Sequence, residues 1–247
     1  MNSPRFPPVD VRKLKAACSN CNLRELCLPA GLDQRELEQV DRFVNQRRPI
    51  KRGGYLYRAG SELQSLYAIR TGFMKSCVLH DDGREQVAGF HMMGDLMGLD
   101  AIGTGRHICD AVALEDSEVC DIPFAALERL SRDIPSLQQH FHRLMSREIV
   151  RDYGVMLLLG SMRAEERLAA FLLNLSQRFA ARGFSPEEFN LRMTRAEMGS
   201  YLGIKLETIS RALSRLHHDG MIEVRNKHIK ITDMNALRAL GGQHACH

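Results

Sequence analysis

The sequence predicts an α+β protein with a strand-rich first half, one long helix and a mainly helical C-terminal third. Three observations predict this order. Between Ile50 and Phe124, short apolar runs are divided by turn signals, as in a small β-barrel or sandwich. From about Ser136 to Ser161 there is no proline, and the apolar residues follow a helical period. The last third contains two short helical segments on either side of a glycine.

The composition is typical of a globular protein. Hydrophobic residues make up 44% of the 247 residues and charged residues 26%, which is enough apolar content for a folded core. No apolar run approaches the roughly 18–20 residues needed to cross a bilayer, so we expect no membrane partner. Residues 1–10 lack the apolar stretch of a secretory signal, which predicts a cytoplasmic protein.

Three cysteines lie close together near the N-terminus. Cys18, Cys21 and Cys27 are spaced so that they can wrap a soft metal or an iron–sulfur cluster. The total of seven cysteines is odd and there is no export signal, so a disulfide framework is not expected. A four-ligand site needs one more thiol, and spacing does not choose among the three cysteines of the strand-rich half. Zinc, an iron–sulfur cluster and a thiol switch all remain compatible with the spacing.

A helix is expected from Leu32 to Val44, where the apolar residues have helical spacing. Strands are expected after it, among them residues 55–57, 66–69 and 73–79. Turn signals containing glycine separate them. Within this region we expect Cys77 and Cys109 to be small buried residues.

The segment from Ser136 to Ser161 predicts a helix of about 25 residues, some 38 Å long at 1.5 Å per residue. Along it, a seam of coiled-coil type has alternating spacings of four and three. Its members are Met145, Ile149, Asp152, Met156 and Leu159. The pattern fits either a core helix or a dimerisation helix. In a parallel homodimer the two Asp152 carboxylates would face each other and keep the dimer weak and reversible, unless Asp152 points outward.

The C-terminal third predicts a helix-turn-helix. Thr194 and Glu197 have the spacing of a capping box at the start of a short helix. Gly203 can adopt the left-handed conformation that ends this helix. A second helix is expected from about Leu206 to His217, followed by a hairpin over residues 222–231.

The polar face of the second helix suits the major groove of DNA. Arginine can donate two hydrogen bonds to guanine, and glutamate can accept one from cytosine. The residues predicted to read or hold DNA from this helix and its surroundings are Lys205, Glu207, Thr208, Ser210, Arg211, Ser214, Arg195, Arg215 and Lys227. Residues 161–247 carry the whole net charge of +4, which favours double-stranded DNA as a partner over an ordinary solvated helical hairpin.

The sequence contains no pattern that predicts catalysis. There is no nucleophile–base pair, phosphate-binding loop or metal-hydrolase motif. His91, His140 and His142 are isolated in the sequence, and we expect each to be structural or exposed. We therefore predict that the protein is not an enzyme and has no catalytic residues.

Six segments together resemble the Crp/Fnr superfamily of bacterial transcription regulators, and within it the oxygen-sensing Fnr and Anr type. They are residues 18–27, 94–98, 115–124, 143–149, 164–169 and 206–211. The resemblance covers nearly the whole chain. It implies an arm with the cysteine cluster (1–28), a β-roll sensor domain like those that bind cyclic nucleotides (29–134), a dimerisation helix (135–162) and a winged helix-turn-helix domain (163–247).

The resemblance also implies a [4Fe-4S] cluster on Cys18, Cys21, Cys27 and a fourth ligand, Cys120, the cysteine that precedes Asp-Ile-Pro-Phe. In the family the intact cluster favours a DNA-binding homodimer. Oxygen converts it to [2Fe-2S], and the dimer weakens. The implied DNA site resembles TTGAT-N4-ATCAA, whose two halves match a two-fold dimer.

Two surfaces of the family touch RNA polymerase, and the resemblance places them in the loop near residues 183–188 and at Asp81, Asp82, Gly83, Arg84 and Glu85.

The chain departs from the relatives that bind cyclic nucleotide. They carry a glutamate where this chain has Leu99, which cannot accept from a ribose hydroxyl, so no cyclic nucleotide is expected. A regulator of the same fold that senses nitric oxide, haem or thiol redox state, and a structural-zinc DNA-binding protein, remain alternatives.

Overall fold

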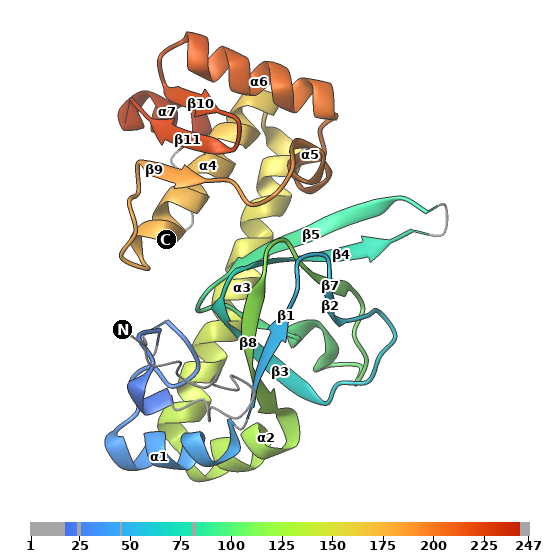
Figure 1. Cartoon of the computed structure of the whole chain (residues 1–247), viewed down its shortest axis with the longest axis vertical. Coiled ribbons are helices and arrows are strands. Elements are labelled where there is room, and N and C mark those ends of the chain that lie inside the picture. The colour runs from blue at the N-terminus through green and yellow to red at the C-terminus, as the bar shows by residue number, and fades with distance from the viewer. Residues whose placement is uncertain (1–17, 24–25, 45, 81–82, 243–247) are drawn as a thin grey trace, which may run out of the picture.

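Helix α3 (Pro135–Ser161) is the axis of the molecule. In the computed structural model it runs from the α1 and α2 end, past the strand-rich domain, to the C-terminal helices (Figure 1). The structure describes residues 18–23, 26–44, 46–80 and 83–242. The N-terminal arm as far as residue 17, the tail with Cys246, and Asp81 and Asp82 lie outside the described residues.

Within the described residues, the N-terminal domain contains two four-stranded antiparallel sheets. Their strand orders are β1-β8-β3-β6 and β2-β7-β4-β5, so neighbours in each sheet come from distant parts of the chain. An apolar core that includes Ile69, Met74 and Val119 lies between them. The strands are β1 (Gln46–Ile50), β2 (Tyr55–Tyr57), β3 (Ser65–Thr71), β4 (Phe73–Leu79), β5 (Glu85–Met92), β6 (Leu96–Met97), β7 (Asp110–Ala113) and β8 (Ser117–Pro123).

Helices α1 (Gln34–Phe43) and α2 (Phe124–Asp133) close one end of this domain (Figure 1). Asp33 and Glu36 form a reciprocal capping box that starts α1. A second apolar core includes Leu37 and Val40 of α1, Leu127 of α2 and Leu137 of α3. The first half of α3 is therefore anchored in the N-terminal domain.

The C-terminal domain is a winged helix-turn-helix. A three-stranded sheet with the order β10-β11-β9 packs beside four helices of the described chain. The wing is the β10–β11 hairpin, whose turn places Asn226 at φ 58°. The elements are α4 (Ala164–Ala180), β9 (Glu188–Asn190), α5 (Arg195–Leu202), α6 (Leu206–His218), β10 (Ile222–Arg225), β11 (His228–Ile231) and α7 (Met234–Gly241).

The predicted α+β class and the order of its parts are confirmed, as are the helix α3, the helix-turn-helix and the hairpin. Strands β1 and β9 were not predicted. Pro49 lies within β1, which is an edge strand of the described sheet and pairs there with β8, so a missing N–H is tolerated. Among the helices that the structure describes, none has the length and apolar character needed to span a membrane.

Candidate cysteine centre and DNA-reading helix

Four cysteines, from two distant parts of the chain, line one small cavity. Cys18, Cys21 and Cys27 come from the N-terminal segment, and Cys120 comes from β8. The other walls are almost entirely apolar. They are formed by Leu28, Pro29, Val40, Val44, Ala68, Arg70 and Ile122. The chain thus brings together the predicted cluster and one distant thiol, while Cys77 and Cys109 are buried elsewhere, as expected.

Backbone hydrogen bonds fold the cysteine segment onto itself, and side-chain hydrogen bonds attach it to two helices. The Cys21 N–H donates to the Cys18 carbonyl at 3.1 Å, in a tight turn. Asp41 of α1 accepts from the Cys18 N–H and, at 2.7 Å, from the hydroxyl of Ser19. His140 Nε2 of α3 lies 3.0 Å from the carbonyl oxygen of Cys27. The segment is therefore attached both to the sensor domain and to the long helix.

The fourth thiol lies on a rigid support. Cys120 lies on β8, between Arg47 of β1 and Ala68 of β3 in the register of the sheet. Glu118, two residues earlier on β8, pairs with Arg70 Nε at 3.3 Å and lies 3.8 Å from Arg47 Nε. Arg47 Nε is buried and has no hydrogen-bond partner within the described chain. Two guanidinium groups thus flank the Cys120 side of the cavity.

Burial in this cavity disfavours the ionised thiolate form of Cys18, Cys27 and Cys120 relative to the protonated thiol. Burial raises the pKa of Cys27 to about 12 and that of Cys120 to about 11. The charge of Cys21 adds to the effect on Cys120, and Arg70 and Arg47 oppose it. Burial, followed by the charge of Cys27, raises the pKa of Cys18 well above its usual range. A positively charged metal group would remove this penalty, because it binds the thiolate form.

The thiols of this cavity are a soft donor set that fits a thiolate-bound metal group. Within the described residues, no three or more thiol, imidazole or carboxylate groups converge closely enough to hold one metal ion. The four thiols nevertheless share one cavity. Four thiolates are the usual ligands of both structural zinc and iron–sulfur clusters, so the lining of the cavity is compatible with either group.

The helix-turn-helix begins with the predicted capping box. Thr194 accepts from the Glu197 N–H, and the Glu197 carboxylate accepts from the Thr194 N–H. Gly203 ends α5 in the left-handed conformation, at φ 64°. Ile209 and Leu213 of α6 are buried against α4 and α5, so the opposite face of α6 is left at the surface.

The surface face of α6 carries the predicted DNA-reading residues. Glu207 and Arg211 are exposed, and Ser210 is half-buried. Arg195 Nη1 donates to the Ser210 hydroxyl at 3.2 Å, which connects α5 to α6. Of the other predicted contact residues, Thr208 is half-buried. The rest are exposed, three of them on α6 or at its N-cap and one in the wing: Lys205, Ser214, Arg215 and Lys227.

The second half of α3 presents an apolar face to solvent. Ile149, Tyr153 and Met156 are 52%, 60% and 64% exposed. Asp152 is exposed on the same helix, and Met145 is half-buried. Of the other predicted seam residues, Leu159 lies beside Gly203 of the helix-turn-helix, with its Cδ2 atom 3.2 Å from the position of a Cβ there. Tyr153 was not predicted as part of this face, although it follows Ile149 by four residues.

The remaining predicted site residues lie in the strand-rich domain. Gly83, Arg84 and Glu85 are exposed near the tip of the β4–β5 hairpin, and Glu85 pairs with Lys75 at 2.5 Å. Leu99 lies in a 3-10 turn and packs against the apolar core around α1 and α3.

Comparison with known proteins places both domains. Residues 47–133 match the cyclic nucleotide-binding domain family, and residues 166–240 match the Crp-like helix-turn-helix domain family. The chain is 52% identical to the fumarate and nitrate reduction regulatory protein of Salmonella typhimurium, over 91% of this chain and 90% of that one. It is 51% identical, with the same coverage, to the protein of that name from Escherichia coli K12. Among solved structures, FixK2 from Bradyrhizobium japonicum matches with a TM-score of 0.74 and 30% identity, over 81% of this chain and 98% of that one.

Proposed function

Because this chain belongs to the Crp/Fnr family of transcription regulators, we propose that it controls transcription in response to oxygen through a [4Fe-4S] cluster. The chain is a DNA-binding regulator of the Fnr type, and its relatives are regulators rather than enzymes. The proposal adds what is sensed, which residues sense it and how DNA binding responds. A regulator of this kind works on DNA in the cytoplasm.

The observation that carries the proposal is the shared cavity of Cys18, Cys21, Cys27 and Cys120. These four thiolates would hold the cluster, since the donor set is soft and the cavity is apolar. When bound, the cluster supplies oxygen-labile redox chemistry and a covalent tie between the N-terminal segment and β8. The protein supplies the ligands, the nearby positive charge of Arg70 and an apolar wall that limits the access of water.

We propose that the dimer forms through the exposed apolar face of α3. Ile149, Tyr153 and Met156 would pack against the same residues of a second copy, as in a coiled coil. Asp152 lies beside this face and would meet its counterpart across the two-fold axis, which keeps the dimer marginal. The cysteine segment touches α3 through His140, so holding or releasing this segment biases dimerisation.

We propose that the dimer reads a palindrome like TTGAT-N4-ATCAA. Arg211 would donate to guanine, Glu207 would accept from cytosine, and Ser210 would contact a further base. Lys205, Arg215 and the wing residue Lys227 would hold phosphates. RNA polymerase would meet the exposed β4–β5 hairpin tip, residues 81–85, although Asp81 and Asp82 lie outside the described chain. Leu99 leaves no acceptor for a ribose, so cyclic nucleotide is not a ligand.

The test begins with the protein purified without oxygen. Iron, acid-labile sulfide, zinc and visible absorption are measured before and after exposure to air, and dimerisation and DNA binding are measured in the same samples. We expect four irons and four sulfides per chain, a spectrum that changes in air and a parallel loss of dimer and DNA binding. Bound zinc with unchanged DNA binding in air, or no cluster after anaerobic reconstitution, would overturn the proposal. A cluster that survives air but responds to nitric oxide would also contradict it.

A further inference from the structure

The DNA-binding domain packs tightly against the sensor domain of its own chain. Phe90 of β5 packs against two aromatic rings of the other domain, with its ring centroid 5.9 Å from that of Phe171 of α4 and 5.1 Å from that of Tyr201 of α5. Phe73, Phe90 and other sensor residues belong to the same apolar cluster as the core of the helix-turn-helix. The contact is therefore a packed interface that fixes an orientation between the two domains.

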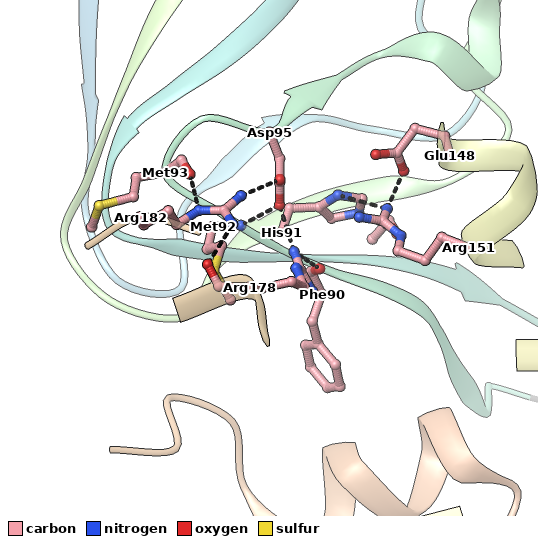
Figure 2. Close-up of polar contacts among 10 residues, drawn as sticks. Phe90, His91, Met92, Met93, Asp95, Glu148, Arg151, Arg178 and Arg182 are labelled. Carbon is pink, nitrogen blue, oxygen red and sulfur yellow. Dashed lines mark hydrogen bonds and ion pairs between the residues drawn. The ribbon is translucent and has the colours of Figure 1, made fainter. Parts of the chain in front are cut away.

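A largely buried carboxylate, that of Asp95, contacts two arginines of the DNA-binding domain (Figure 2). Asp95, in the turn between β5 and β6, accepts from Arg178 Nη2 at 2.5 Å and from Arg182 Nη2 at 2.6 Å. Both arginines come from the C-terminal end of α4 and the residues that follow it. Arg178 also donates to the Phe90 carbonyl at 2.9 Å, and Arg182 to the Met93 carbonyl at 2.5 Å. We call Asp95, Arg178 and Arg182 the α4 clamp.

The α4 clamp depends on an ionised Asp95 carboxylate paired with two charged guanidinium groups. The Arg178 and Arg182 guanidinium groups hold the pKa of Asp95 well below its usual range, against the effect of its burial. The side chains of Asp95 and Arg182 are only 11% and 7% exposed. A buried ion pair of this kind adds little net stability, but loss of one partner leaves an unpaired buried charge. Its main effect is therefore to define how α4 sits against the β5–β6 turn.

The same turn touches the cysteine segment and the long helix. A Cβ built on Gly94 would lie 3.0 Å from Leu26 Cβ, and Leu26 directly precedes Cys27. Arg151 of α3 pairs with Glu148 and lies 3.5 Å from Nδ1 of His91 in β5 (Figure 2). The region from His91 to Asp95 is thus where the cysteine segment, α3 and the DNA-binding domain meet.

We propose that Asp95 is a positioning residue for DNA recognition: through the α4 clamp, the β5–β6 turn transmits the placement of the Leu26–Cys27 segment to the orientation of the DNA-binding domain. This inference rests on the proposed function, because it assigns the cysteine segment as the sensor. A dimer gains from two half-sites only if both recognition helices reach them together. The clamp sets that geometry, whereas α6 itself reads the bases.

The interface has a second set of polar contacts, which joins the β4–β5 hairpin to α5 and could act as a hinge. Here Lys75 of β4 pairs with Glu197 of α5 at 3.1 Å, and the Val87 N–H donates to the Ser200 hydroxyl at 2.8 Å. With these contacts held, release of the clamp frees α4 to rotate about the aromatic contact. Loss of the clamp is therefore expected to change orientation without unfolding either domain.

The test is Asp95→Asn in the full-length cluster-containing protein, with Asp116→Asn as the matched control. Asp116 is an exposed carboxylate of the same domain that pairs with Lys51 at 2.6 Å. Binding is measured to the palindrome, to palindromes with the half-sites one base pair closer or farther apart, and to a single half-site. We expect Asp95→Asn to weaken binding to the palindrome roughly tenfold or more, to reduce discrimination between spacings, and to leave half-site binding and iron content unchanged.

A second variant, Arg182→Gln, keeps the test informative if Asp95→Asn folds poorly. Hydrogen exchange at α4 and at residues 91–95 is followed in the wild type before and after exposure to air. We expect protection at both segments to fall together in air and to be low from the start in either variant. Unchanged spacing preference in both variants, or tighter palindrome binding, would overturn the inference. Iron and sulfide content tests the cluster proposal separately, so the two failures can be distinguished.

Discussion

The cysteine centre and the DNA-reading helix are built in opposite ways. The cysteine centre draws its thiols from the N-terminal segment and from β8, about a hundred residues apart in the sequence. The reading face of α6 comes from one continuous helix whose start, turn and buried side are local. The thiols are partly buried and close to one another, whereas Glu207 and Arg211 stand exposed in water.

This difference separates the part that changes from the part that reads. Burial, together with the charges of neighbouring thiols, raises the pKa values of Cys18, Cys27 and Cys120, and a bound cationic group would favour their thiolate forms. The recognition helix is stabilised by its own cap and apolar face and needs no such group. We therefore propose that a signal at the cysteines would act on DNA binding through dimerisation and domain orientation, since α6 is already formed.

The largest effect is expected from Cys120→Ser, which removes the one thiol that would connect the proposed cluster to the sheet. Iron and sulfide content should fall to near zero, and specific DNA binding should be lost with it. Hydrogen exchange in α5 and α6 should stay as in the wild type, because those helices are locally stabilised. The measurements are metal analysis and exchange on the same sample.

Cys109→Ser is the matched control for Cys120→Ser. Cys109 is a buried cysteine of the same domain that lies outside the cavity, with its Sγ 3.4 Å from Asp100. This variant should keep its iron. Equal iron loss in both variants would show that the domain, rather than the ligand set, had been damaged.

Arg211→Ala tests the DNA-reading role of α6 while leaving the cysteine centre intact. It should weaken binding to the palindrome by about 10- to 100-fold, as expected for one bidentate contact worth ~1–3 kcal/mol. Cluster content and the oxygen response of dimerisation should not change. Arg238→Ala, an exposed arginine on α7, serves as the control and should bind as the wild type does. A changed visible spectrum in Arg211→Ala would contradict the separation of the two regions.

Asp152→Ala addresses the connection between the two regions. Removal of two facing carboxylates should tighten the dimer by roughly fivefold, corresponding to about 1 kcal/mol of repulsion. The tighter dimer should bind DNA even after exposure to air. Sedimentation of cluster-free protein measures the effect, with Glu38→Ala of α1 as an exposed carboxylate control. No change in the dissociation constant would mean that Asp152 points away from the partner.

The recognition helix could be predicted from the sequence because everything that forms it is local. The capping residues Thr194 and Glu197, the turn at Gly203 and the apolar face of α6 all lie within a short stretch, and the structure confirms them. The same holds for α3, whose helical period was visible in the sequence although Tyr153 was overlooked as part of its exposed face.

The cysteine centre could be predicted only in part. Spacing found Cys18, Cys21 and Cys27, but the choice of Cys120 depended on family resemblance, because the pairing of β8 with β1 and β3 is set by tertiary structure. The α4 clamp was missed for the same reason. Asp95 and Arg182 are far apart in the sequence, and isolated charged residues usually predict an exposed surface rather than a buried pair.

The smallest effect is expected from Lys227→Ala in the wing. Lys227 is exposed and its Nζ donates to the Arg192 carbonyl at 3.1 Å, so it lies beside the segment that joins β9 to α5. Loss of one phosphate contact should weaken binding by a few-fold for every sequence and reduce the salt dependence of log K by about one. Arg211→Ala should instead change the preference among sequences. If Lys227→Ala altered base preference at one position, the wing would share in reading the DNA. Base recognition would then not be confined to α6.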